Sequence, residues 1–192
     1  MTQHSLFGAA ASEPTLVDLD GVVLGGGLWV RQGDTARLSV IVAERWRADA
    51  LAAEFALRDV GTRDAVVRAE GGYGARSAFS ANLAGSATRW SLGARQGPPP
   101  GFILSPGGLR LWAIVSGRAD PAGYLLGTAR PDDAVHLACG AQLSRLGLGA
   151  VSIPARGGPG WRVTSAKRIR RLAELLGDPP ADAGTDWPLP FA

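Results

Sequence analysis

The sequence contains few of the side chains that catalyse reactions or bind metal ions. Its two histidines are His4 and His136, and its single cysteine is Cys139. A structural zinc site needs four such ligands, so these three residues make no zinc set. The glycines at 25–27 lack the Lys-Ser/Thr of a phosphate-binding loop, and no Gly-x-Ser-x-Gly motif is followed by an acid and a histidine. We therefore expect no catalytic residue, no metal ion and no cofactor.

Arginine is the side chain whose number and placement suggest a binding chemistry. Lysine and arginine together number 20 against 17 acids, which gives a net charge of +3, and Lys167 is the only lysine. The planar guanidinium group matches phosphate geometry and pairs with guanine edges. The candidate nucleic-acid-binding residues, on predicted strands and at the start of the last helix, are Arg31, Arg37, Arg68, Arg76, Arg156, Arg162, Thr164, Lys167 and Arg168. The alternative interpretation is that they are ordinary solvated residues of an arginine-rich chain.

An internal repeat relates the two parts of the chain. The segment AEGGYGAR (69–76) returns 86 positions later as ARGGPGWR (155–162), with the paired glycines, a third glycine and the final arginine in register. The same offset, without a gap, matches Asp34 with Asp120 and Gly61 with Gly147. A repeat of this kind indicates that one structural unit is built twice.

Each copy is predicted to contain the same elements in the same order. Glycine adopts the positive φ angles that a tight reversal needs, so each glycine turn is expected to join two antiparallel strands. Gly61 and Gly147 are expected to end the longer helices. The predicted segments are helices at 14–24, 48–56, 83–92, 106–116, 135–146 and 166–176, strands at 27–31, 37–43 and 123–129, and hairpins at 65–82 and 150–165.

This order of elements, given twice, resembles the LAGLIDADG homing-endonuclease fold in its single-chain form. The stretch GVVLGGGLWV (21–30) stands where that family has the end of its signature helix. Within the superfamily, residues 24–27 and 141–177 are similar to the N-terminal domain of WhiA-type sporulation regulators. The resemblance implies an α+β fold, namely a tandem pseudo-symmetric αββαββα repeat that forms a saddle of two antiparallel sheets. It also implies that the two signature helices pack together through glycines.

The resemblance raises the question of nuclease activity. In active members of the family, each signature helix ends in an acid, and the two acids hold a divalent metal for phosphodiester cleavage. The matching positions here are Gly26 and, by the 86-residue offset, Trp112, and neither side chain binds a metal. Asp18 and Asp20 come nearly two turns earlier, and Asp120 comes after the second helix. We therefore predict no cleavage, with an atypical endonuclease that uses Asp18 or Asp20 as an alternative.

Prolines and glycines divide the chain into five expected segments. These are a flexible N-terminus at 1–13, a first half at 14–95, a linker at 96–106, a second half at 107–177 and a Pro-rich tail at 178–192. No apolar run approaches the roughly 20 residues of a membrane helix, and the N-terminus does not resemble a secretion signal. Together with the single cysteine, these features predict a cytoplasmic monomer that does not contact membranes.

Two classes of function remain open. The first is a non-catalytic DNA-binding or transcription-regulating protein whose arginine-lined sheets contact double-stranded DNA. The second is a protein-interaction or scaffold domain, because WhiA-type regulators carry a helix-turn-helix after this domain and the present sequence shows none. A continuous basic saddle favours DNA as the partner, whereas an apolar or mixed surface favours a protein.

Overall fold

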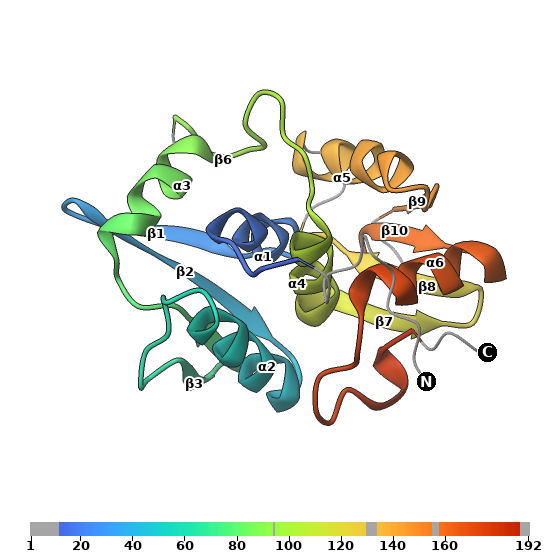
Figure 1. Ribbon diagram of the computed structural model, residues 1–192, viewed down its shortest axis with the longest axis horizontal. Coiled ribbons are helices and arrows are strands. Elements are labelled where there is room, and N and C mark those ends of the chain that lie inside the picture. The colour runs from blue at the N-terminus through green and yellow to red at the C-terminus, as the bar shows by residue number, and fades with distance from the viewer. Residues whose placement is uncertain (1–11, 94, 130–133, 155–157, 189–192) are drawn as a thin grey trace.

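The computed structural model describes residues 12–93, 95–129, 134–154 and 158–188, and it has an α+β fold with two four-stranded antiparallel sheets (Figure 1). The strand orders are β1-β2-β4-β3 in one sheet and β7-β8-β10-β9 in the other. The strands are β1 (Leu28–Gln32), β2 (Thr35–Val42), β3 (Val66–Ala69), β4 (Gly72–Arg76), β7 (Gly117–Asp120), β8 (Gly123–Gly127), β9 (Val151–Ile153) and β10 (Gly160–Val163), with a small separate pair, β5 (Ser91–Leu92) and β6 (Arg95–Gln96). The helices are η2 (Leu16–Leu19), α1 (Asp20–Leu24), α2 (Arg45–Ala56), η3 (Ala81–Leu83), α3 (Ala84–Arg89), α4 (Pro106–Ser116), α5 (Ala134–Arg145), α6 (Ala166–Leu176) and η5 (Gly184–Asp186).

Three strands of each sheet pair in the same register. In the first sheet, Ala75 pairs with Val40 on one side and with Val66 on the other. The corresponding residues of the second sheet are Trp161, Leu126 and Ser152. Each of these lies 86 positions after its counterpart, so the offset found in the sequence is also the offset of strand pairing.

The first strand of each sheet departs from that offset. Leu28 pairs with Ser39 in the β1–β2 hairpin, whereas Arg118 pairs with Leu125 in the β7–β8 hairpin. Leu125 lies 86 positions after Ser39, but Arg118 lies 90 positions after Leu28. The cause is the place of the second hairpin turn, which comes two residues later than the repeat predicts. Pairing in a hairpin is counted outward from the turn on both strands. When the turn lies two residues later, a given residue of the second strand therefore pairs with a residue four positions further along the edge strand.

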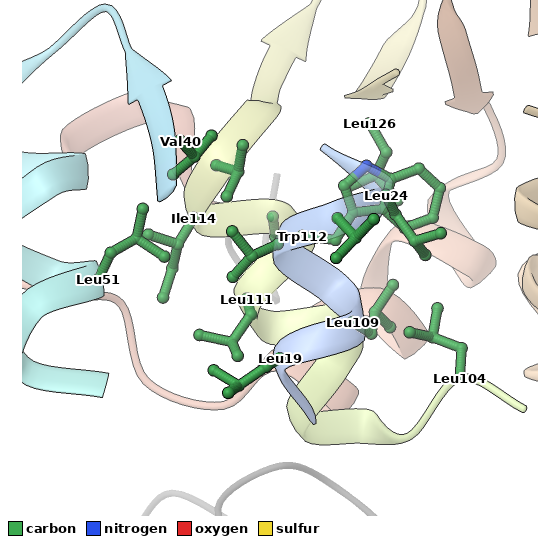
Figure 2. Packing of buried hydrophobic residues seen from close by; sticks show 14 of the residues in the cluster. Leu19, Leu24, Val40, Leu51, Leu104, Leu109, Leu111, Trp112, Ile114 and Leu126 are labelled. Carbon is green, nitrogen blue, oxygen red and sulfur yellow. The ribbon is translucent and has the colours of Figure 1, made fainter. Parts of the chain in front are cut away.

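Helices α1 and α4 lie side by side between the two sheets, and the hydrophobic core surrounds them (Figures 1 and 2). We call their contact the helix seam, defined by Gly21 and Gly25 of the α1 segment and by Gly108 and Val115 of α4. A Cβ atom at Gly21 would overlap the carbonyl oxygen of Gly108, so only glycine permits this approach. Figure 2 shows that side chains of both helices and both sheets form one continuous cluster, which includes Val40, Leu51 and Leu126.

The two longer helices end in the same hydrogen-bond pattern but not with the same residue. After α5, Gly147 has φ = 77° and the amide of Leu148 donates to the carbonyl of Leu143, as predicted for a glycine-ended helix. After α2, the left-handed residue is Asp59, with φ = 57°. The prediction that Gly61 ends this helix is therefore wrong. Asp adopts the left-handed conformation more readily than most residues, which lets the reversal occur before the glycine.

Two segments outside the sheets, the connector before α4 and the tail after α6, also pack against the hydrophobic core. Between the halves, the buried Phe102 and Leu104 are fixed by Gln142, whose side chain bonds the carbonyl of the first and the amide of the second. In the tail, the indole of Trp187 is buried and donates to the carbonyl of Gly177, as predicted for one of the tail aromatics. Residues 1–11 of the N-terminus expected to be flexible (1–13) lie outside the described residues, as does Phe191. None of the described helices has the length and apolar character needed to cross a bilayer.

Candidate nucleic-acid interface

Each sheet has one side that faces the helices and one open side. Along β2, Leu38, Val40 and Val42 are buried toward the helices, whereas Arg37 and Ile41 alternate to the other side. Cross-strand partners share a side, so the pairings assign every strand residue to one of the two sides. The open face of the first sheet carries Leu28, Val30, Arg37, Ser39, Ile41 and Arg76, and that of the second sheet carries Arg118, Asp120, Leu125, Val151, Ile153 and Arg162.

On the first open face, two arginines lie among aliphatic side chains. Arg76 pairs with Ser39 across the strands, and its Nε donates to the carbonyl oxygen of Asp64 at 2.8 Å. The guanidinium of Arg37 lies 4.6 Å from the centre of the Phe79 ring, within the range of a cation–π contact. Leu28 is 60% exposed and Ile41 is 62% exposed on the same face. This face is therefore mixed, with positive charge beside exposed apolar surface.

On the second open face, Leu125 of β8 lies between two arginines in the strand register. Arg118 of β7 is its partner on one side, and Arg162 of β10 is its partner on the other. Leu125 is only 1% exposed although it points away from the helices, so neighbouring side chains cover it. The carboxylate of Asp120 spans Nε and Nη2 of Arg162, at 2.9 and 3.1 Å. A hydrogen bond from the Ala122 amide, together with this guanidinium, lowers the pKa of Asp120 below its usual value. Asp120 is thus a charged anchor for Arg162.

Arg76 and Arg162 occupy equivalent places on the two open faces. They lie 86 positions apart, and their cross-strand partners Ser39 and Leu125 are separated by the same number. Both arginines end the matched glycine-turn segments, so the repeat in the sequence places one guanidinium at the same register position of each sheet. The expectation that these two arginines are matched between the copies is confirmed at the level of strand register.

Several other candidate residues lie elsewhere. Arg31 pairs with Ala36 and Arg68 pairs with Tyr73, which places both on the helix-facing sides of their strands. The guanidinium of Arg68 lies 4.7 Å from the Tyr73 ring. These two candidates therefore do not lie on the open face, because neighbouring strand residues alternate in direction.

The remaining candidates lie at or beyond the end of the second sheet. Thr164 is exposed and directly follows β10, in alternation with Arg162. Lys167 and Arg168 are exposed on α6, which packs against α4 in the helix layer and not on the open face. Arg156 lies outside the described residues.

Arg118 is the open-face arginine that sequence reasoning missed. The sequence gives no strand pattern between 116 and 123, because α4 runs directly into β7 at Gly117 without a loop. A signal was nevertheless present. Pro121 follows Asp120, and proline fixes the φ angle that favours a turn, so the segment Asp120–Gly123 indicates a hairpin with a strand before it.

Two buried acids lie near the helix seam. Oδ1 of Asp18 accepts a hydrogen bond from the Ser105 hydroxyl at 2.6 Å, and its Oδ2 accepts one from Arg58 at 2.9 Å. Asp20 accepts hydrogen bonds from the Trp90 indole at 2.6 Å and from Arg89 at 2.8 Å. Burial raises the pKa of Asp20 above its ordinary value, although these donors oppose the shift. Both acids are engaged in contacts that join segments distant in the chain.

The ends of the seam helices carry no acid. Counted by the 90-residue offset of the edge strands instead of the 86-residue offset, the position that corresponds to Gly26 is Ser116, which is not an acid either. The Ser116 hydroxyl donates to the carbonyl of Gly127 at 2.8 Å. Trp112 lies inside α4, fully buried, and its indole donates to the same carbonyl. Within the described part of the chain, no group of three or more His, Cys, Asp or Glu residues is placed to hold a metal ion.

No protein-family model matches this chain, and no curated protein matches it with significant similarity.

Proposed function

We propose that this chain is a non-catalytic, LAGLIDADG-like protein that binds double-stranded DNA through the open faces of its two sheets. In this proposal, the two halves form a pseudo-symmetric tandem repeat, and the sheets together make a saddle that lies along the duplex. Binding of this kind suits a regulatory role, as in the WhiA-type regulators that the sequence resembles.

The observation that carries the proposal is the equivalence of Arg76 and Arg162. The two sheets present one guanidinium group each at the same register position. Two equivalent donors of this kind suit a partner whose acceptor groups recur along its length, as those of a DNA duplex do. On the strands of the described open faces, the charged residues are four arginines, namely Arg37, Arg76, Arg118 and Arg162, and a single carboxylate, Asp120. The net positive charge of the two faces supplies the phosphate attraction on which DNA affinity depends, whereas the mixed character of the first face supports the second candidate below.

Fluorescence anisotropy with a labelled duplex at low and moderate salt tests the proposal. The double variant Arg76→Ala/Arg162→Ala should bind at least tenfold more weakly, and the affinity of the wild type should fall as salt rises, by about 0.9 in the log–log slope for each phosphate that the faces neutralise. The matched control is Arg45→Ala/Arg170→Ala, which removes the same charge from exposed helix positions and should bind like the wild type. Absence of duplex binding by the wild-type chain at low salt contradicts the proposal.

A protein partner is the second candidate, and the exposed aliphatic side chains of the first sheet favour it. Leu28, Val30 and Ile41 lie on the same open face as Arg37 and Arg76. Apolar side chains beside arginine, with few lysines, are typical of the centre of protein interfaces. The duplex titration separates the two candidates, because changing Leu28 and Ile41 to serine should leave salt-dependent DNA binding nearly intact but remove a protein interface.

A further inference from the structure

The equivalent arginines Arg76 and Arg162 are each anchored on the same side of the guanidinium group. In Arg76, Nε donates to the backbone carbonyl of Asp64 at 2.8 Å. In Arg162, Nε and Nη2 lie against the two oxygens of Asp120, at 2.9 and 3.1 Å. The anchors are chemically different, since one is a neutral carbonyl and the other is a carboxylate. Both engage the Nε side of the guanidinium group, which we call its inner side.

An anchor on the inner side leaves the end of the guanidinium group, formed by Nη1 and Nη2, for a ligand. We call this end the outer edge. A guanidinium group has five N–H donors in a fixed plane, and its Nη1 and Nη2 atoms can form two parallel hydrogen bonds at the end of the side chain. Within the described residues, Nη1 of Arg76 and Nη1 of Arg162 have no protein acceptor. Since each side chain is already fixed at its inner side, less conformational freedom is given up when the outer edge binds.

The charge beside Arg162 distinguishes between acceptors for that outer edge. The adjacent carboxylate cancels much of the attraction for an anion, so a phosphate gains less here than at a lone arginine. A neutral pair of acceptors is not penalised in this way. The O6 and N7 atoms of guanine form such a pair, at the spacing that the two outer donors match. Val151, exposed and directly cross-strand from Arg162, offers an apolar neighbour for a flanking thymine methyl group.

We infer that Arg76 and Arg162 are the sequence-reading residues of the chain, each pairing with one guanine in the major groove, and that Asp120 positions Arg162 for this task. The inference rests on the proposed DNA binding and adds that the binding is selective. Arg37, whose guanidinium lies over the Phe79 ring on the first face, then contributes affinity without an anchor of this kind.

Selection from a random-sequence duplex library, followed by titration of the selected and randomised duplexes, tests the inference. The wild type should enrich sequences with guanine at two fixed positions. Arg162→Lys keeps the charge but cannot form the paired donors, so it should lose guanine preference at one position by about tenfold or more while it binds randomised duplex like the wild type. Arg170→Lys, an exposed position on α6, is the matched control and should change neither property.

The variant Asp120→Asn gives the second measurement. It keeps an oxygen acceptor for the Ala122 amide but removes the charge that holds Arg162. We expect tighter binding of randomised duplex at low salt and weaker guanine preference at the Arg162 position, two changes in opposite directions that a general loss of folding does not produce. Uniformly weaker binding by Arg162→Lys with unchanged preference overturns the inference and makes this arginine a phosphate contact. Absence of binding to every duplex contradicts the proposed function itself.

Discussion

The hydroxyl of Ser105 donates a 2.6 Å hydrogen bond to Oδ1 of Asp18, which joins two residues 87 positions apart. The same hydroxyl accepts a hydrogen bond from the amide of Gly108 at 2.9 Å, so it also caps the N-terminus of α4. Asp18 is 4% exposed, and its other oxygen pairs with Arg58. One serine therefore begins a seam helix and compensates a buried carboxylate of the opposite half.

Replacing this serine should cost more than the loss of a helix cap alone. Ser105→Ala removes the cap and leaves Asp18 short of one donor, so we expect the free energy of unfolding to fall by about 2–3 kcal/mol. Ser165 caps α6 in the same way but at an exposed position, and Ser165→Ala should cost only about 1 kcal/mol. Urea titrations of both variants measure the difference, and equal costs would argue against a coupling across the seam.

The close approach of the seam helices predicts strong intolerance of a single methyl group. In Gly21→Ala, the added Cβ would meet the carbonyl of Gly108 and force the helices apart, which should destabilise the protein by about 3 kcal/mol or more. Gly85 lies in α3 with nothing within 4 Å of a built Cβ. Gly85→Ala should therefore be neutral or stabilise by about 0.5 kcal/mol. Thermal unfolding followed by circular dichroism compares them, and an unchanged midpoint for Gly21→Ala contradicts the observed packing.

Arg47 is predicted to be essential for stability. It is 4% exposed and donates to the carbonyls of Ile114 and Gly117 at the end of α4, at 2.9 and 2.8 Å. Arg47→Met leaves these carbonyls without their donor, and we expect a loss of about 3 kcal/mol. Arg45→Met, two residues away on the exposed side of α2, removes only a surface pair with Asp49 and should cost less than about 0.5 kcal/mol. Chemical denaturation of the two variants should separate them clearly.

The buried Asp20 should make stability depend on pH in an unusual direction. Its pKa is raised above 3.8, chiefly by burial, so the folded protein binds this proton more tightly than the unfolded chain. Its contribution is therefore most favourable below pH 3.8 and decreases as pH rises through the folded-state pKa. Asp20→Asn does not ionise, so the stability of the wild type relative to this variant should decrease over that interval. Denaturation at several acidic pH values gives this difference, and a rise with pH would show that the donors from Trp90 and Arg89 outweigh burial.

The acids near the seam predict the outcome of a nuclease assay. Asp18 and Asp20 are committed to protein donors, and the helix ends carry Gly26 and Ser116. Supercoiled plasmid incubated with the chain and Mg²⁺ should therefore remain supercoiled. Nicking that disappears in Asp18→Asn or Asp20→Asn would restore the alternative of an endonuclease with atypical acids, whereas nicking that persists in both variants would indicate a contaminating enzyme.

The elements that the sequence predicts well are those with a strong local pattern. α4 begins at Pro106 and ends at Ser116, as predicted, because a proline at the first helical position and apolar residues at helical spacing mark its course. The strand register between β2, β3 and β4 follows from the repeat, since matched glycine turns fix where each hairpin reverses. Pattern and turn chemistry act over a few residues, so they can be found without the rest of the fold.

The features that the sequence does not predict depend on contacts between distant segments. Nothing in the neighbourhood of Asp18 indicates that Ser105 and Arg58 meet it, because the three residues come from separate elements. The anchor of Arg162 was hidden for a related reason. Asp120 belongs to β7, a strand that directly follows a helix and has only four residues. Until that strand is placed, the pairing of its last residue with an arginine 42 positions away has no local signal.

The ion pair between Arg47 and Asp186 spans 139 positions of the chain. The same guanidinium also donates to the carbonyls of Ile114 and Gly117, so one buried charge draws its partners from the middle and from the far end of the sequence. These contacts are therefore non-local, and the loop-closure entropy of all the intervening residues has to be compensated before Arg47 is fully paired.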